Sequence, residues 1–346
     1  MSLFSKPAGC LGVDIGTSSI KIVELIKDGD KNKLASYGFC ENTAGKLTSD
    51  WQNNVKKTAK AINKIILEAG MSSRRVVSAL PTYSVFSSVL TLVNVDKKDL
   101  ASAVHWEAKK VIPIPLEEMI LDWKKIEDPS LEKGNVKVLL TGAPRTLVKR
   151  YIEIFKEAQL TLLSLETETF SLVRALLGHD QTTVMMVELG TNSTDISIVE
   201  KGIPTINRSL DIGGVTVTKA LGNNLSIGLE RAEQFKYDLG IGSLDSTEEI
   251  VPKTIIETLG PVINEIKFVL NLFQNKNTSK VERILLSGGA SLLPNLSNYL
   301  AKLLNINVVL ASPWSRISYP VELKQVLDEI GPRMAVSAGL ALRQLD

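Results

Sequence analysis

Histidine and cysteine are scarce in this chain of 346 residues, which contains two of each. His105 and His179 lie far apart in the sequence, which argues against a histidine metal site and against a histidine general base. Cys10 and Cys40 show no CxxC spacing, so the sequence predicts neither a disulfide framework nor a structural zinc. This cysteine usage favours a reducing compartment such as the cytosol.

A dominant charge sign and a long apolar run are also absent. The 40 basic and 38 acidic residues are mixed along the chain and leave a net charge of +2, so we expect no nucleic-acid partner. No run of eighteen apolar residues occurs, and the first ten residues lack the pattern of a signal peptide. The sequence therefore predicts a cytoplasmic protein without a transmembrane segment of its own.

Two common nucleotide-binding motifs are missing as well. The chain contains no GxxxxGK[ST] motif and no GxGxxG motif after a strand, which argues against the P-loop and Rossmann folds. Strand-like and helix-like segments alternate along the whole chain instead, and this order predicts a mixed α/β sheet with helices on its faces. Residues 81–158 show a βαββα pattern that indicates a small inserted subdomain, with its last helix at 145–158.

A short internal repeat carries most of the functional information. Residues 13–19 (VDIGTSS) align with residues 187–193 (VELGTNS), with an identical or chemically similar residue at every position. Each copy has a carboxylate at the end of an apolar strand, then a glycine that allows a tight turn, then small polar residues. Such a turn can offer N–H groups to phosphate oxygens while the carboxylate holds a hydrated Mg²⁺. One copy alone is often an ordinary β-turn, but two copies and a third glycine turn at 287–290 predict a nucleotide site shared by two halves.

These turns resemble those of the actin, Hsp70 and sugar-kinase superfamily. Lys21 stands seven residues after Asp14, and Thr194 stands six residues after Glu188, as in the two phosphate loops of that superfamily. The resemblance implies an actin-like (Hsp70/actin ATPase) fold of the α/β class, built from two duplicated ribonuclease-H-like halves. It also implies that ATP and Mg²⁺ are the cofactors.

The same resemblance implies which residues hold the nucleotide. They comprise the two phosphate loops, a turn before a helix, a helix that touches ribose and adenine, and an adenosine loop. The expected cofactor-binding residues are Asp14, Gly16, Thr17, Ser18, Ser19, Lys21, Glu188, Gly190, Thr191, Asn192, Thr194, Gly213, Gly214, Glu233, Lys236, Gly288, Gly289 and Ala290. Asp14 and Glu188 would hold Mg²⁺ through water. No catalytic residue is assigned firmly, and Glu188 and Glu166 are the candidates.

Glu188 departs from the superfamily pattern, which usually has aspartate at this position. The added methylene moves the carboxylate by about 1 to 1.5 Å on standard bond lengths. A misplacement of about 1 Å can cost on the order of 100-fold in rate, because an attacking water must be held in line. We therefore expect slow or absent ATP hydrolysis.

A closer resemblance is to the type IV pilus assembly protein PilM family, which is related to the division protein FtsA. It rests on residues 111–123 (VIPIPLEEMILDW), on Ala79-Leu80-Pro81 and on residues 168–175 (ETFSLVRA), and it extends over nearly the whole chain. Taken alone, the two prolines of the first segment indicate only a helix stop followed by an edge strand. The resemblance implies that the cytoplasmic tail of the membrane protein PilN binds in a groove beside an FtsA-like inserted subdomain.

The expected domain boundaries follow from this family. The first actin-like half comprises residues 1–80, 160–180 and 334–346, the inserted subdomain 81–159, and the second half 181–333 with a helical, nucleotide-contacting subdomain. By resemblance, residues 166–175 and 335–343 form the two helices that connect the halves. The chain lacks the amphipathic C-terminal helix of FtsA and the transmembrane helix of GspL, so we expect peripheral association with the inner membrane through partner proteins.

The function we expect is a cytoplasmic, ATP-binding scaffold of the type IV pilus assembly platform that binds PilN and contacts other platform or motor proteins. One alternative is a filament-forming actin-like ATPase, and homo-oligomerisation stays open. Another is a small-molecule kinase of the same superfamily, for which the sequence offers no catalytic aspartate in a clear context.

Overall fold

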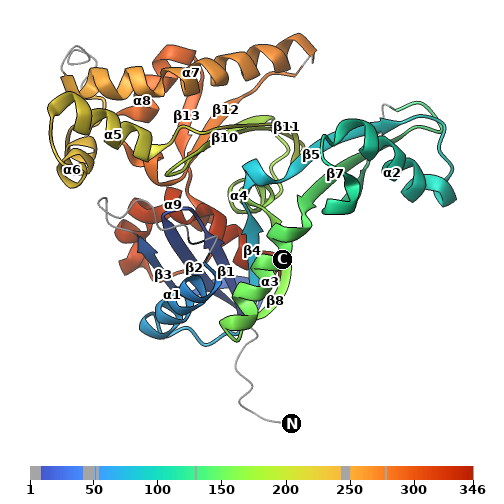
Figure 1. The fold of residues 1–346 in the computed structure, drawn as a ribbon, viewed down its shortest axis with the longest axis horizontal. Coiled ribbons are helices and arrows are strands. Elements are labelled where there is room, and N and C mark those ends of the chain that lie inside the picture. The colour runs from blue at the N-terminus through green and yellow to red at the C-terminus, as the bar shows by residue number, and fades with distance from the viewer. Residues whose placement is uncertain are drawn as a thin grey trace.

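A computed structural model describes residues 9–41, 51, 54–128, 131–242, 250–276 and 279–345. Two five-stranded sheets, each covered by helices, form the two halves of the molecule, and a smaller three-stranded sheet extends from one side (Figure 1). None of the described helices combines the length and the apolar character needed to cross a bilayer.

The sheet of the first half has the strand order β3-β2-β1-β4-β8. Its first three strands form an antiparallel meander, and β4 and β8 add parallel to β1 and β4. The strands are β1 (Gly9–Ile15), β2 (Ser19–Asp28), β3 (Lys31–Glu41), β4 (Arg75–Leu80) and β8 (Thr161–Thr167).

Side chains that alternate along β1 fill both faces of this sheet. Leu11 and Val13 share a core with α1 (Val55–Glu68) and α3 (Arg145–Glu157). Cys10 lies on the opposite face, with α4 (Glu168–Leu176) and α9 (Lys324–Leu342). At Gly12 a Cβ would lie 1.9 Å from the carbonyl oxygen of Ser337, so α9 packs directly on the backbone of β1.

The second half repeats the plan of the first, with the strand order β11-β10-β9-β12-β13. Again three antiparallel strands are followed by two parallel ones. The elements are β9 (Val184–Leu189), β10 (Thr194–Glu200), β11 (Ile203–Leu210), β12 (Arg283–Ser287), β13 (Asn307–Leu310), α5 (Gly214–Leu225), α6 (Leu229–Leu239), α7 (Ile250–Lys276) and α8 (Leu296–Leu304). The matching strand orders confirm the predicted duplicated α/β fold.

The small unit consists of the sheet β5-β7-β6 and one helix, and β5 lies beside β11 of the second half (Figure 1). Its elements are β5 (Phe86–Leu92), α2 (Leu100–Val111), β6 (Met119–Ile126) and β7 (Val136–Pro144). The sequence interpretation placed helix 145–158 in this unit, but α3 packs beside α1 on the first sheet. The reason is that Tyr151, Ile154 and Phe155 are fully buried in the core of that half.

Two other elements differ from expectation. The strand β8 was not predicted, and it contains Glu166, which the sequence interpretation assigned to a connecting helix. Its parallel pairing with β4 joins segments about eighty residues apart, and local pattern does not reveal such a contact. The last helix begins at Lys324 instead of Ala335 and contains Pro332 in its interior, because packing against the sheet outweighs the helix-breaking preference of proline.

A candidate nucleotide cleft between the two halves

A cavity of about 400 Å³ lies between the halves and is lined by residues of both. Most of the residues that the sequence singled out line it together. They are Asp14, Gly16, Thr17, Ser18, Ser19, Lys21, Glu188, Gly190, Thr191, Gly214, Glu233, Lys236, Gly288, Gly289 and Ala290. Their roles toward a nucleotide remain predictions.

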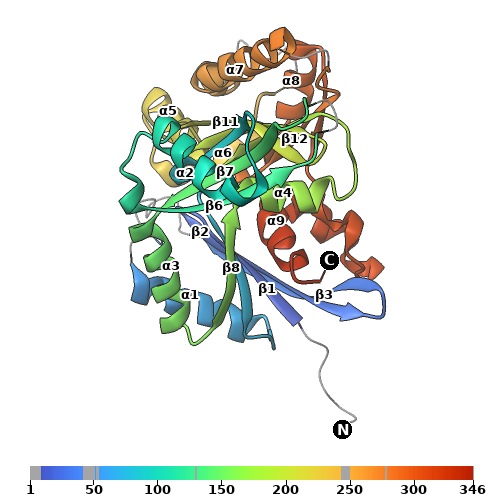
Figure 2. The same cartoon turned by 90° about the vertical axis from the view of Figure 1, so that its right-hand side faces the viewer.

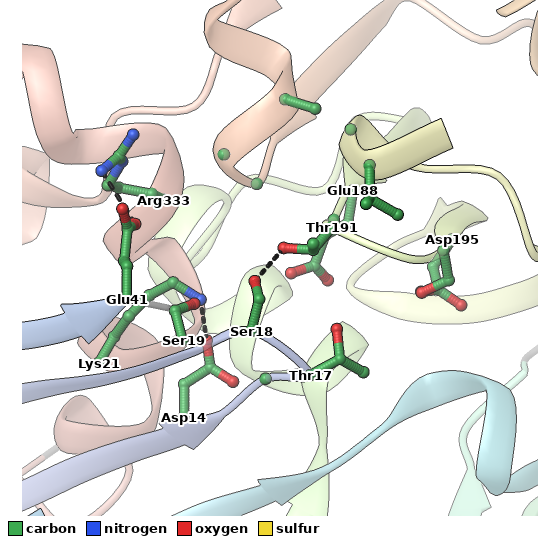
Figure 3. Close-up of a pocket in the computed structure, with 18 of the residues that line it drawn as sticks. Asp14, Thr17, Ser18, Ser19, Lys21, Glu41, Glu188, Thr191, Asp195 and Arg333 are labelled. Atoms are coloured by element: carbon green, nitrogen blue, oxygen red, sulfur yellow. Dashed lines mark hydrogen bonds and ion pairs between the residues drawn. The ribbon is translucent and has the colours of Figure 1, made fainter. Parts of the chain in front are cut away.

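The two repeated turns have the same geometry and face each other. Gly16 N–H donates to the carbonyl of Ser19 at 2.9 Å, and Gly190 N–H donates to that of Ser193 at the same distance. The hydroxyl oxygens of Ser18 and Thr191 are 2.5 Å apart and connect the turns across the cleft (Figure 3). The internal repeat of the sequence is therefore a pair of corners around one cavity.

Three predicted residues do not line the cavity. Gly213 supports the second turn, because a Cβ there would lie 2.5 Å from the carbonyl oxygen of Thr191. The hydroxyl of Thr194 is buried and donates to the carbonyl of Ile212 at 2.6 Å, so it anchors the segment before α5. Asn192 is exposed, and the neighbouring Ser193 contributes to the lining instead.

The third turn requires glycine for a steric reason. Gly288 has φ of +83°, and a Cβ at this position would lie 2.3 Å from the carbonyl oxygen of Leu189 at the end of β9. Its N–H donates to the carbonyl of Pro332 at 2.8 Å, which connects this turn to α9. The glycine thus allows the second repeated turn, the third turn and the last helix to meet closely.

Lys21 supplies positive charge at the first turn. Its ammonium group lies 2.9 Å from the carboxylate of Asp14, across the strand pair β1–β2 (Figure 3). Burial opposes the charge of Lys21, but the carboxylates of Asp14, Glu188 and Glu41 outweigh it and raise the pKa of the ammonium. Lys21 is therefore charged at neutral pH.

Carboxylates outnumber their charge partners around this turn. Burial, followed by the negative charges of Glu168 and Asp14, raises the pKa of Glu188 well above its usual value. Burial and the charges of Asp195 and Asp14 raise the pKa of Glu168 to about 8, and burial raises that of Asp195 to about 6. Such a cluster favours a cation as ligand. Within the described residues, no three His, Cys, Asp or Glu side chains are placed to hold a metal ion directly.

Another part of the cleft is formed by α6 and the middle of α9. Lys236 is almost fully buried and donates to the hydroxyl of Thr218 at 2.9 Å and to Glu233 at 2.7 Å. Burial lowers the pKa of Lys236, and Glu233 partly opposes this effect. Arg333 pairs with Glu41 at 3.1 Å and also lines the cleft (Figure 3).

Sequence reasoning missed several cleft residues. Glu41, Glu168, Asp195, Tyr237 and Arg333 all line the cavity. For Asp195, its position directly after Thr194, which the sequence singled out, could have indicated it. Glu168 begins a segment that carried only the family resemblance, and the other three come from the end of a strand and from helices without a local motif. Only the fold brings these residues together.

Glu166, one of the two catalytic candidates, does not line the cleft. Arg174 donates to both of its carboxylate oxygens, at 2.6 and 2.8 Å, and Arg343 also pairs with it. This arrangement corrects the sequence interpretation, because the carboxylate faces a different cavity. Glu168, two residues later at the start of α4, reaches the cleft instead.

That different cavity is a groove of about 740 Å³ between the small unit and the first half. β6 and β8 line it, and each is the last strand of its sheet. Its wall is apolar at Leu80 and Ile120, and Arg174 and Arg343 line it as ion-pair partners of Glu166. The groove therefore offers two strand edges and an apolar wall to an extended segment.

The family model of the type IV pilus assembly protein PilM matches residues 12–345. This chain belongs to the PilM family. The match confirms the resemblance seen in the sequence.

Solved structures agree with the assignment to the PilM family. A structure described as the PilM-PilN type IV pilus biogenesis complex is 26% identical, has a TM-score of 0.83 and covers 97% of this chain and 98% of that one. MreB5 of Spiroplasma citri bound to AMPPNP is 10% identical with a TM-score of 0.56, covers 97% of this chain and 95% of its own, and shows the actin-like fold alone.

This chain is also similar in sequence to cell division proteins. FtsA of Bacillus subtilis is 23% identical over 88% of this chain and 78% of its own length. FtsA of Neisseria meningitidis is 22% identical over 95% of this chain and 88% of its own length.

Proposed function

We propose that this PilM-family protein is a nucleotide-binding scaffold of the type IV pilus assembly platform, acting on the cytoplasmic side of the inner membrane. Its cleft binds ATP with Mg²⁺, and its groove binds the cytoplasmic tail of PilN. The observation that carries the nucleotide part is the pair of matching turns, joined across the cleft by Ser18 and Thr191. Two turns of this kind, one from each half, suit a ligand with several phosphate groups.

The residues around the turns fit a magnesium nucleotide. Lys21 and the N–H groups of the turns that begin at Gly16 and Gly190 would contact phosphate oxygens. Burial, the largest cause, raises the pKa values of Glu188, Glu168 and Asp195, and a divalent cation nearby would favour their ionised forms. Asp14 and Glu188, which both line the cleft, would hold Mg²⁺ through water. Bound Mg²⁺ would supply charge neutralisation at the phosphates.

Slow hydrolysis fits the same geometry. The longer side chain at Glu188 moves a carboxylate that would otherwise orient water. Glu168, which also lines the cleft, has a pKa of about 8 and accepts a hydrogen bond from Thr82 N–H at 2.7 Å. At neutral pH a carboxyl group with this pKa is mostly protonated and is a weak general base. The bound nucleotide would thus stabilise a conformation instead of being turned over.

The groove suits the tail of a partner protein. A tail in extended conformation can pair with the free edge of β6 or β8 while its side chains enter the apolar wall. The family membership and the structural likeness to the PilM-PilN complex support PilN as this partner.

Calorimetric titration with ATP and Mg²⁺, together with a phosphate-release assay, tests the nucleotide part. We expect saturable binding with negligible phosphate release, and loss of binding in Asp14→Ala and Gly190→Asp variants. A Lys253→Gln variant on the exposed side of α7 is the matched control and should bind as the unchanged protein does. Absence of ATP binding, or rapid release of phosphate in the presence of a metabolite, would contradict the scaffold proposal and favour a kinase. ATP-dependent sedimentation would favour a filament.

A further inference from the structure

Helices α1 and α3 lie next to each other on one face of the first sheet, at the end of the molecule opposite α7 and α8 (Figures 1 and 2). Their inner sides are buried in one shared core. Their outer sides face solvent, and no other described element covers the exposed residues of these sides.

The outer sides carry an excess of positive charge. The two helices contain eight of the 40 basic residues but only three of the 38 acidic ones, so the rest of the chain is net acidic. The exposed basic residues follow helical spacing. They include Lys56, Lys60 and Lys64 on α1 and Arg145, Lys149 and Lys156 on α3, and we call these six residues the basic face.

Ion pairs within the helices do not neutralise this face. Lys64 lies 3.7 Å from Glu68, and Lys149 lies 4.0 Å from Glu153, in each case between exposed side chains. Exposed pairs at these distances are weak and are screened by salt. The positive potential of the basic face therefore extends into solvent.

A large apolar side chain projects from each helix among the basic residues. Leu67 on α1 is 81% exposed, and Ile152 on α3 is 51% exposed. A single exposed apolar residue is common on protein surfaces. Apolar side chains within a stripe of lysine and arginine, however, are typical of surfaces that lie on a bilayer, where the charges meet lipid headgroups and the apolar groups enter the interface.

The basic face continues into the groove proposed to bind the PilN tail. Val148 of α3 lines the groove, and Lys149 follows it on the outer side of the helix. A tail that leaves the membrane and enters this groove would bring α3 near the bilayer. This step rests on the proposed function, whereas the charge and the exposed apolar residues do not.

We propose that the basic face docks on the surface of a bilayer that contains anionic lipids. The charge complementarity is with the lipid headgroups, and Leu67 and Ile152 reach the interface between headgroups and acyl chains. Docking in this way would hold the groove close to the membrane from which a tail emerges. Near an anionic surface each lysine or arginine strengthens binding by about fivefold.

Co-sedimentation of the full chain with lipid vesicles tests this proposal without any partner protein. We expect binding to vesicles that contain phosphatidylglycerol, little binding to phosphatidylcholine vesicles, and weaker binding as salt rises. A Lys56→Gln/Lys60→Gln/Lys64→Gln variant should bind about 100-fold more weakly. The matched control is Lys253→Gln/Lys267→Gln/Lys302→Gln, which removes three exposed lysines from α7 and α8 at the opposite end.

Several outcomes would overturn the proposal. They are equal binding to neutral and anionic vesicles, an α1 variant that binds as the unchanged protein does, or an equal loss in the control variant. Circular dichroism and thermal unfolding show that each variant is folded. The α1 variant should still bind a PilN tail peptide, so failure of the vesicle experiment and failure of the groove proposal can be told apart.

Discussion

At the scale of single residues, close approach of backbone segments decides which side chains the cleft tolerates. Gly288 and Gly289 are neighbours in the same turn, yet their surroundings differ. A Cβ on Gly288 would lie 2.3 Å from a carbonyl oxygen, whereas a Cβ on Gly289 would meet no atom within 4 Å. The backbone of Gly288 also has φ of +83° and ψ of 165°, a conformation that is essentially restricted to glycine.

We therefore predict that Gly288→Ala lowers the free energy of unfolding by about 2 kcal/mol or more, from backbone strain and steric overlap. Gly289→Ala is the matched control and should change it by less than about 1 kcal/mol. Urea unfolding followed by circular dichroism measures both. Similar unfolding midpoints for the two variants would show that the third turn is not tightly packed.

At the scale of secondary-structure elements, the junction between β8 and α4 serves both cavities. Glu166, near the end of β8, faces the groove and pairs with Arg174 of α4. Glu168, the first residue of α4, lines the cleft and accepts a hydrogen bond from the N–H of Thr82, near the start of the small unit. Residues two apart on a continuous strand would point to the same face. The two side chains diverge because the chain passes from β8 into α4 between them.

The groove between β6 and β8 leads to a prediction about partner binding. Ile120 on β6 is 40% exposed and lines the groove, so Ile120→Glu should leave the fold intact and place a charge in an apolar wall. We expect the affinity for a PilN tail peptide to fall by about tenfold or more, because a carboxylate without a partner resists desolvation. Fluorescence anisotropy with a labelled peptide measures this effect.

The control for this prediction lies on the opposite edge of the same small sheet. Thr91 is an exposed residue of β5, and Thr91→Glu adds the same charge away from the groove. It should leave the affinity for the peptide unchanged. Equal loss in both variants would indicate a general charge effect instead of a binding site in the groove.

At the scale of the whole molecule, folding brings carboxylates of both halves to one cleft. Asp14 and Glu168 come from the first half, and Glu188 and Asp195 come from the second. Burial and the neighbouring negative charges raise the pKa of Glu168 from 4.5 to about 8. The folded protein therefore holds a proton on Glu168 over a pH range in which the unfolded chain has lost it.

This difference predicts how stability depends on pH. The contribution of Glu168 to stability is fully present below about pH 4.5 and is lost as the pH rises to about 8, because over this range the unfolded chain ionises Glu168 while the folded state keeps its proton. In a Glu168→Gln variant this loss should be absent. The unfolding temperature of the variant should therefore increase relative to that of the unchanged protein as the pH rises from 5 to 8.

Thermal unfolding at several pH values, without nucleotide, measures this gap. Glu282→Gln, at an exposed position of the second half, is the control and should follow the unchanged protein. If the difference in unfolding temperature between Glu168→Gln and the unchanged protein stayed constant across this pH range, the pKa of Glu168 would not be raised in the folded protein.

Local signals in the sequence were sufficient for the two repeated turns and for the order of elements in residues 81–158. The repeat at 13–19 and 187–193 predicted two corners, and both have the same hydrogen bond between a glycine N–H and a carbonyl three residues later. The βαββα pattern predicted for residues 81–158 matches the observed order of β5, α2, β6, β7 and α3. These features depend on contacts between residues that are close along the chain, and local patterns describe such contacts well.

The sequence by itself thus determined the family, the duplicated α/β fold and the residue types of the two facing turns. Tertiary structure alone decided that β8 joins the first sheet, that Glu168 faces the cleft while Glu166 faces the groove, and that the lysines of α1 lie beside the basic residues of α3. Each of these depends on contacts between segments far apart along the chain. Their energy comes from burial and charge in three dimensions, which no local pattern records.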